Sequence, residues 1–311
     1  MYFPYLRGKQ FELIALREQS ELLGLNKLKV SPVLEPVKQS STLTNTLKEL
    51  IAKDVNINFV INPSKGDMSG SLKPLELLQN VFKDYKNYQT AVIIKSYDNA
   101  KKVINAINKS KFKHQGFTLI HIDKLDEIDE IYEGFSSIAP IKYNLINLDN
   151  SNRRYTRRFE ASTIVGLADY FKAQSKNAAY LNVMESDFSE EHLFYKDEGN
   201  AGFGDYLTIG DNYSESGFLP YAVAIHLSYG NKKKFIKIKH FVSDSNDDTS
   251  DIGGKFEEAL TKLVVWCKAN EIKTDAVKEF YRLDSSKHFP GLGTIKKLSL
   301  QNHIEVVLNL I

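Results

Sequence analysis

Charged and polar residues end the apolar runs in the first half of this sequence. Each run closes on a side chain that can bind an ion or move a proton, and the residue types differ from run to run. These closing residues are Arg7, Glu35, Asn62, Lys95, Asp123 and Asp149. Asp169 and Asp205 stand in similar places later in the chain. The carboxylates of such a set could together hold a divalent cation such as Mg²⁺, because hard cations prefer oxygen ligands.

Two kinds of role follow from these residue types. Lys95 could bind a phosphate group, or act as a base if burial lowers its pKa. The candidates for catalysis are Lys95, Asp123, Asp149 and Asp205. The candidates for ligand binding are Arg7, Lys9, Glu35, Asn62, Asp169 and Tyr206. The alternative is structural, since strands end in polar residues where they leave a core, and such residues often cap the next helix. No pair of these residues forms a motif of fixed spacing, so the sequence does not identify a metal.

The elements that would position these side chains form a repeating unit. Tyr2 to Leu6 is typical of a strand, Arg7-Gly8-Lys9 of a polar turn, and Phe11 to Leu23 of a helix. The strand pattern recurs at 29–37, 57–61, 90–94, 117–122 and 143–148. Amphipathic helical patterns follow most of these strands, including 41–52 and 74–85. Continuously apolar strands are typical of a parallel sheet that helices cover on its faces.

A repeated strand–helix unit either closes into a barrel or remains an open sheet, because its crossovers are right-handed. No early strand is followed by the glycine-rich turn that an open nucleotide-binding sheet usually carries. The differing residues at the strand ends would converge on one end of a barrel. We therefore predict an α/β fold, a (β/α)₈ TIM-barrel-like single domain over residues 1–311.

The pattern loosens after Asp149, and the regular repeats are expected to occupy 1–170. Ser162 to Leu167 is predicted as strand seven, and the polar stretch 171–199 as short helices and loops. Gly202 to Gly210 is the preferred strand eight, with 222–227 as the alternative. The segments 221–229 and 234–242 alternate like a β-hairpin, which we interpret as an insertion within 171–253. The part 254–311 is expected to hold extra C-terminal helices, at 256–267, 275–282 and 298–310.

A run of arginines is the second candidate site. Arg153, Arg154, Arg157 and Arg158 form i, i+4 pairs, so on a helix they would make a basic stripe that could grip phosphate or nucleic acid. Alternatively, the run is a solvated face or pairs with acidic loops. The whole chain has 41 basic and 39 acidic residues, a net charge of +2. This balance gives no general attraction to nucleic acid or to a membrane, so nucleic acid is not expected as a global partner.

Composition excludes several other functions. The one cysteine, Cys267, excludes an intramolecular disulfide framework and a cysteine-based zinc cluster, and its apolar surroundings predict a buried structural thiol. The histidines lack metal-binding spacing. The stretch Asp211 to Gly217 lacks the spacing of a calcium loop and is expected to be an ordinary loop. We expect a soluble cytoplasmic protein, because neither a targeting segment nor an apolar run of membrane-spanning length is visible.

Two stretches carry a resemblance to a known family. The opening YFPYLRGKQFELIALRE resembles the start of the beta family proteins, a group first named in a T-even bacteriophage. The stretch GFGDYLTIGDNYSESGFLPYAVAIHLSY, with IKIKHFVSD after it, is similar to a bacterial branch of that family. The segments ADYFKAQSKNAAYLN and FSEEHLFY fit between them, so the resemblance covers nearly the whole chain. The matching residues are Arg7, Lys9, Glu12, Asp205, Tyr206, Asp211, Tyr213, Glu215 and His226.

The resemblance implies a setting rather than a reaction. It implies a protein of mobile elements and antiviral defence islands, encoded beside a small nuclease-like companion, and it transfers no catalytic residue. Two hypotheses remain. In the first, the barrel binds, and could hydrolyse, a phosphorylated or nucleotide-type ligand at the strand ends. In the second, the protein is a non-catalytic interaction or regulatory subunit that binds a partner through the hairpin and 196–220, with Phe218, Leu219 and Tyr221 as exposed apolar candidates.

Overall fold

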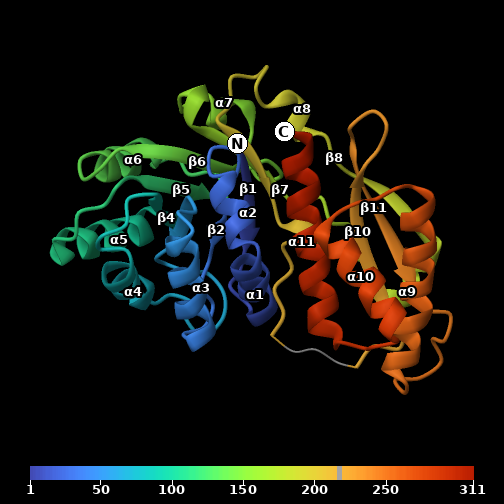
Figure 1. The fold of residues 1–311 in the computed structure, drawn as a ribbon. Coiled ribbons are helices and arrows are strands. Elements are labelled where there is room, and N and C mark those ends of the chain that lie inside the picture. Colours follow the sequence, from blue (N-terminus) through green and yellow to red (C-terminus); the bar gives the residue numbers. More distant parts are fainter. Residues whose placement is uncertain (216–218) are drawn as a thin grey trace. The chain divides into compact units, whose positions relative to one another are not determined.

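The structure is a computed structural model that describes residues 1–215 and 219–311. The chain divides into two compact units (Figure 1). The first comprises Met1–Ala168 and Glu191–Asp205, and the second comprises Asp169–Glu190 and Tyr206–Ile311. Part of the second unit is therefore inserted in the sequence of the first. The organisation as one domain stays a prediction.

The first unit is a closed barrel of eight parallel strands with flanking helices, which confirms the predicted (β/α)₈ fold. The strands in barrel order are β1 (Tyr2–Leu6), β2 (Val33–Leu34), β3 (Ile57–Val60), β4 (Tyr88–Ile94), β5 (Phe117–His121), β6 (Ile141–Asn147), β7 (Ile164–Ala168) and β9 (Gly202–Asp205). Strand β9 pairs with β7 and with β1, and so closes the barrel. It is the predicted strand eight, but it ends at Asp205, and 222–227 belongs elsewhere.

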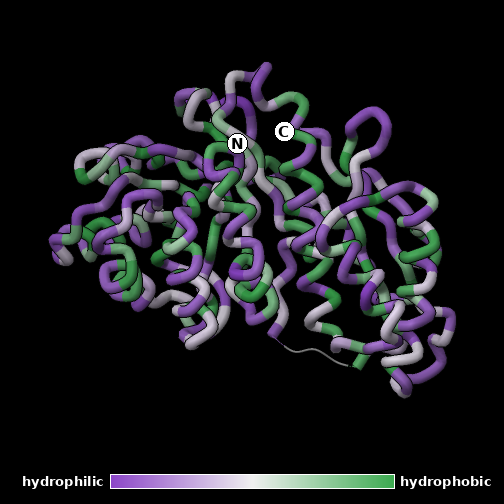
Figure 2. Tube along the Cα trace, viewed as in Figure 1, coloured by the Kyte–Doolittle hydropathy of each residue, from purple (hydrophilic) through white to green (hydrophobic). Residues whose placement is uncertain are grey.

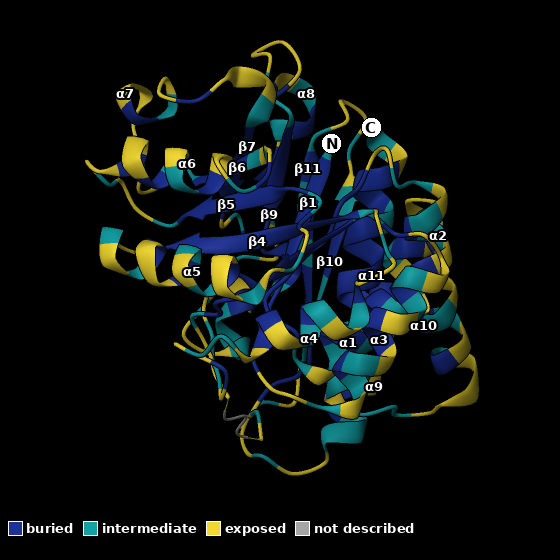
Figure 3. Cartoon of the chain, turned by 90° about the vertical axis from the view of Figure 1, so that its left-hand side faces the viewer, coloured by how far each residue is buried: buried dark blue, intermediate teal, exposed yellow. Residues whose placement is uncertain are grey.

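Burial explains why these sequences form barrel strands. Every residue of β4 and β5 is buried, as their continuous apolar character predicts (Figure 3). Strand β2 is shorter than the predicted 29–37. Pro32 and Pro36 flank it, and a proline has no N–H to donate to a sheet ladder, so the strand itself is limited to Val33–Leu34, with one isolated bridge from Val30 to Tyr2 before it.

Helices follow most barrel strands and turn an apolar face inward. They are α1 (Gln10–Glu18), α2 (Ser20–Leu25), α3 (Ser41–Ala52), α4 (Lys73–Val81), α5 (Tyr97–Ser110) and α6 (Ile128–Ser136). Hydrophobic and hydrophilic residues alternate along most of them (Figure 2). Ser40 caps α3, as the sequence allowed, because its hydroxyl accepts a hydrogen bond from the Leu43 N–H.

The regular alternation breaks after β6. Only the one-turn helix α7 (Arg153–Thr156) and the 3₁₀ turn η1 (Ala161–Thr163) link β6 to β7. Between β7 and β9 the chain forms η2 (Asn177–Asn182), β8 (Glu185–Ser189) and α8 (Glu191–Phe194). The prediction of 171–199 as helices and loops missed β8, because its sequence, ESDFS, is polar.

The second unit contains a three-stranded antiparallel sheet in the order β10-β11-β8. The predicted hairpin is confirmed as β10 (Ala224–Gly230) paired with β11 (Ile236–Val242). In the sequence it follows the last barrel strand, after the 3₁₀ turn η3 (Leu207–Ile209), so the barrel is interrupted by the segment with β8 and not by the hairpin.

Three long helices complete the second unit: α9 (Ile252–Ala269), α10 (Asp275–Ser286) and α11 (Leu292–Leu310). Each was predicted, with shorter bounds. They share an apolar core with the sheet, in which Ile225, Leu227 and Phe241 meet Phe256 and Phe280. Cys267 is a buried free thiol in this core, as expected, and burial raises its pKa to about 12.

Candidate functional site

The predicted site residues of the first unit all lie at the carboxyl ends of barrel strands. Arg7, Glu35 and Lys95 come directly after β1, β2 and β4. Asn62, Asp123 and Asp149 come two residues after β3, β5 and β6, and Asp205 is the last residue of β9. Since all eight strands are parallel, these ends lie at one end of the barrel, where barrel enzymes carry their sites.

These residues differ in whether their side chains point into the barrel or away from it. Successive side chains of a strand point to opposite faces. The rings of Phe3 on β1 and Tyr143 on β6 lie 4.9 Å apart, although β1 and β6 are not neighbours, so both point into the barrel. Tyr5 and Arg7 lie two and four residues after Phe3, so their side chains are on the inner face of the barrel as well. Asp205 lies in register with Pro4 and therefore points the other way.

Arg7 and Glu35 form a buried ion pair at this end of the barrel. The Arg7 Nε lies 3.8 Å from Glu35 Oε2, and both side chains are almost fully buried. The Tyr5 hydroxyl donates to the same Glu35 oxygen at 2.9 Å. The Ser64 N–H and hydroxyl donate to the other oxygen at 2.5 and 2.8 Å. Glu35 thus joins the ends of β1, β2 and β3.

This arrangement requires glycine in the turn after β1. Gly8 has a φ of +59°, and a Cβ there would lie 3.1 Å from the Glu35 carbonyl oxygen. Any other residue would meet both backbone strain and crowding. The turn also brings the Arg7 N–H to Glu12 Oε2 at 2.7 Å. Lys9, the other basic residue of the turn, is half-buried and precedes the first residue of α1.

Asn62 is engaged with the backbone of the neighbouring strand. Its amide donates to the Ile93 carbonyl at 2.8 Å, and its side-chain oxygen accepts from the Ile93 N–H at 2.9 Å. Both amide functions are therefore used to fasten the chain after β3 to β4. A role in positioning the barrel ends fits these contacts better than direct binding of a ligand.

Lys95, Asp123 and Asp149 are exposed, and the acidic pair makes only local contacts. The Asp123 carboxylate accepts from the next residue's N–H at 2.8 Å. The Asp149 N–H donates to the Asn147 side chain at 2.9 Å. Within 1–215 and 219–311, His, Cys, Asp and Glu side chains nowhere form a group of three or more that could hold a metal ion. The shared carboxylate site for a divalent cation is therefore not formed.

Asp205 is buried and accepts a hydrogen bond from the Tyr2 hydroxyl at 2.8 Å. Burial, and then the neighbouring carboxylate, raise the pKa of Tyr2 well above its usual value. Asp169 and Tyr206 belong to the second unit. There, Asp169 accepts from the N–H groups of Phe171 and Asp211, at 3.0 and 2.8 Å. The predicted loop 211–217 lies partly outside the described residues.

The arginine run proves to be an anchored segment with three exposed cations. Tyr155 and Phe159 are buried, and the Tyr155 hydroxyl lies 2.9 Å from His121 Nδ1 on β5. Arg158 forms an ion pair with Asp129 and donates to the carbonyls of Leu125 and Asp126. The i, i+4 spacing of the two aromatic residues was the signal that this segment has a buried face.

The remaining arginines are Arg153, Arg154 and Arg157. All three are exposed, and within the described parts of the chain their side chains have no hydrogen bond or ion pair. The Asn150 amide donates to the Ile122 carbonyl at 3.0 Å, which fastens the loop before α7 to the end of β5. The three arginines are thus held at the carboxyl end of the barrel. The predicted stripe of four is shortened, since α7 ends at Thr156.

A buried histidine pair in the second unit was not predicted. His226 on β10 and His240 on β11 are cross-strand partners whose Nδ1 atoms lie 2.8 Å apart. Their rings pack on Tyr180. Burial lowers the pKa of His226 to about 3 and that of His240 to about 4. One neutral imidazole donates to the other in this arrangement, and burial disfavours the charge that a further proton would bring to the pair.

Comparisons with known proteins add no assignment to this geometry. No family model matches the sequence, and no curated protein matches it either. None of the helices in the described parts of the chain is both long and apolar enough to cross a membrane.

Proposed function

We propose that the carboxyl end of the barrel binds an anionic, phosphate-bearing ligand. The observation that carries this proposal is the state of Arg153, Arg154 and Arg157. The segment that bears them is fastened by buried aromatic residues and by Arg158, yet these three guanidinium groups stay exposed and unpaired within the described chain. Guanidinium groups bind phosphate through two parallel hydrogen bonds, which favours this ligand class.

Two lysines support the same ligand. Lys95 follows β4 and Lys124 lies just after β5, and the side chains of both are exposed with no partner among residues 1–215 and 219–311. Strands β4, β5 and β6 are neighbours in the barrel. Paired strands lie about 4.8 Å apart, so cations that follow them can reach one ligand of nucleotide size.

Acidic residues at the same end narrow the ligand class. Asp123 and Asp149 are exposed beside these cations. Carboxylates accept hydrogen bonds from hydroxyl groups and repel a second phosphate. A nucleotide or sugar phosphate, with one anionic group and several hydroxyls, suits this mixture better than a long polyanion. Binding rather than turnover is what these contacts support, because Glu35 and Asn62 are already engaged in holding strands together.

A thermal-shift titration tests the proposal. Nucleotides, sugar phosphates, inorganic phosphate and short single-stranded DNA would be compared on the wild type and on the variant Arg153→Ser/Arg154→Ser/Arg157→Ser. A ligand at 100 times its Kd adds about 2.7 kcal/mol, or roughly 4 °C in a chain of this size. The matched control is Lys232→Ser/Lys233→Ser, which removes exposed cations from the turn between β10 and β11. A shift that persists in the arginine variant would refute the proposal.

A second candidate function is that of an interaction subunit. It is favoured by apolar side chains that stand exposed on the second unit, including Leu219 and Tyr221. Phe218, the third predicted member of that group, lies outside the described residues. A nuclease-like companion and a role in antiviral defence rest on the beta family resemblance. Purification of the tagged chain from its host, followed by identification of a stoichiometric companion, would test them, and recovery of the chain alone would count against them.

A further inference from the structure

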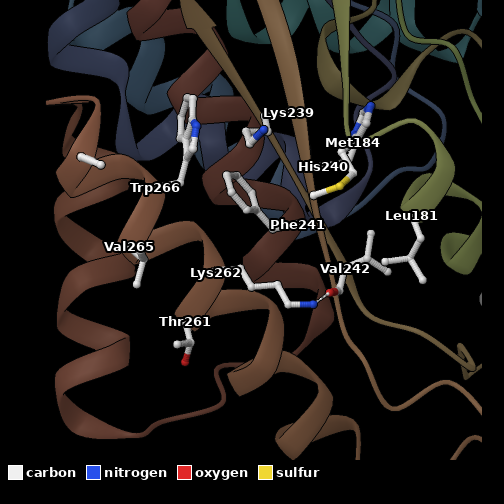
Figure 4. A pocket seen from close by; sticks show the side chains of 11 residues that line it. Leu181, Met184, Lys239, His240, Phe241, Val242, Thr261, Lys262, Val265 and Trp266 are labelled. Carbon is white, nitrogen blue, oxygen red and sulfur yellow. Dashed lines mark hydrogen bonds between the residues drawn. The ribbon is translucent and has the colours of Figure 1, made fainter.

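We propose that a groove of the second unit, between α9 and the end of β11, receives an amphipathic helix of a partner protein. The helix would be apolar on its docking face and acidic along its flank. The groove has a volume of about 500 Å³, within the range of specific binding pockets. Its lining includes Leu181, Met184, Lys239, Lys262, Val265 and Trp266 (Figure 4).

One wall of the groove is a face of α9. Lys262, Val265, Trp266 and Ala269 recur at the three- and four-residue spacing that places side chains on one side of a helix. The opposite faces of α9 carry Leu260, Leu263 and Cys267 into the core. Helix α9 therefore has two apolar faces. One packs in the core of the unit, and the other lines the groove.

The rim of the groove is apolar as well as its floor. Val265 is 64% exposed, Met184 55% and Leu181 41%. Single exposed apolar residues are ordinary, but several around one apolar cavity mark an interaction surface. A small ligand would be held inside the cavity and would leave this rim in water. A macromolecular partner covers both, and methionine adapts its shape to such partners.

The backbone beside the groove favours a helix over an added strand. The His240 N–H donates to the Met184 carbonyl at 2.9 Å, and the Val242 carbonyl accepts from Lys262 Nζ at 2.7 Å (Figure 4). These groups, which an incoming strand would need, are engaged within the unit. A helix satisfies its own backbone and needs only apolar contact from the groove.

The charged residues of the groove lining indicate which charge the flank of the partner helix should carry. The charged residues of the lining are Lys239 and Lys262, and no acidic residue is among the lining residues. Lys239 Nζ lies 5.5 Å from the Trp266 ring, and Glu185 at 3.6 Å holds it there. Asp244 holds Lys262 at 2.7 Å. Each ammonium group has three donors, so both can also face an acidic side chain on the partner.

Fluorescence of Trp266 tests this inference, since it is the only tryptophan in the chain. The probe is a designed 18-residue helix with leucines on one face and glutamates along the flank. We expect a saturable change in emission, and at least tenfold weaker binding by the same peptide with lysines in place of the glutamates. Val265→Glu and, separately, Met184→Glu should each weaken binding at least tenfold. Leu28→Glu, at an exposed leucine of the first unit, should leave it unchanged.

Several results would overturn the inference. Equal binding of the acidic and basic peptides, or binding unaffected by both groove substitutions in folded protein, would do so. Saturation of the signal by decanoate, with no response to peptide, would identify a small-molecule pocket instead. Self-association that Val265→Glu abolishes would identify a second copy as the occupant. The arginine triple variant must bind the peptide normally, so failure here is distinguishable from failure at the barrel.

Discussion

The carboxyl end of the barrel and the groove of the second unit place charged and apolar groups in opposite ways. In the barrel, Arg7 and Glu35 are buried and form an ion pair, while the side chains of Arg153, Arg154 and Arg157 are exposed and unpaired within the described chain. In the second unit, His226 and His240 are bonded inside the sheet, while Val265 and Met184 are exposed. In both places, the buried residues bind a partner within the chain and hold the fold. The exposed residues have no such role and are the candidates for binding a ligand.

The largest expected effect is on the buried pair. Glu35→Ala would remove the acceptor of the Tyr5 hydroxyl and both Ser64 donors, and the carboxylate that faces Arg7. Loss of one partner of a buried ion pair costs about 3 to 5 kcal/mol of unfolding free energy. Denaturant unfolding would measure it. Asp123→Ala, at an exposed carboxylate, is the matched control and should stay within about 0.5 kcal/mol. Equal stability of the two variants would contradict a structural role for Glu35.

The second prediction concerns the stability of the fold at acidic pH. Folding lowers the pKa of His226 and His240 below the ordinary histidine value, through burial first and then through repulsion from His240 and Lys296 at His226 and from Lys239 at His240. The unfolded chain therefore binds more protons between pH 6.5 and about 4, so stability falls as pH falls through that window. The expected slope is up to about 1.4 kcal/mol per pH unit for each histidine.

The comparison for this prediction is the double variant His226→Gln/His240→Gln. Denaturant unfolding from pH 7 to 4.5 should show a shallower slope for the variant than for the wild type. His114 and His121, whose pKa values burial lowers to about 4, would contribute to the slope that remains. An unchanged slope would mean that folding does not lower the pKa of either histidine.

A smaller effect on stability is expected to distinguish Arg158, whose side chain is paired, from Arg153, whose side chain is unpaired within the described chain. Arg158→Ala would lose the ion pair with Asp129 and two hydrogen bonds to carbonyls. Because the site is partly exposed, we expect a cost of only about 1 kcal/mol. Arg153→Ala should change stability by less than about 0.5 kcal/mol, since the side chain has no partner in the described chain. Thermal unfolding would compare them, and a reversed order would refute the division.

The smallest effect is expected at the groove. Val265→Glu should change the free energy of unfolding by no more than about 0.5 kcal/mol, because this side chain is mostly exposed. The same substitution is expected to weaken peptide binding strongly. A large effect on binding with a small effect on stability would separate a binding residue from a residue that holds the fold. A large loss of stability would show that Val265 belongs to the core rather than to a binding surface.

Much of the fold was accessible from the sequence, and the reasons are local. Continuous apolar strands such as TAVII and amphipathic helices repeat with a regular period, which predicted the barrel and its order. Strand β8 was missed because ESDFS carries no apolar pattern, and it becomes a strand only through pairing with β11. The predicted ends of β2 were wrong because Pro32 and Pro36, which flank it, have no N–H to donate to the sheet.

The positions of the candidate residues at strand ends were predicted correctly, while their role as a site stays a prediction. Topology alone put Glu35, Lys95 and Asp123 at strand ends. Their partners could not be predicted, because Tyr5 and Ser64 reach Glu35 from about thirty residues away in either direction. The groove was invisible for the same reason, since it needs segments near 181, 240 and 265 to meet. Contacts of this range depend on the closed fold and leave no periodic trace in the sequence.

The order of segments in the chain limits how the protein can be divided. Strand β8 is encoded before β9, yet it pairs with β11, which is encoded after the barrel is complete. A gene cut after Asp205 would leave the second half without β8. Its β11 would then offer an unpaired edge of the kind that promotes aggregation. No single cut of the gene therefore separates the two units.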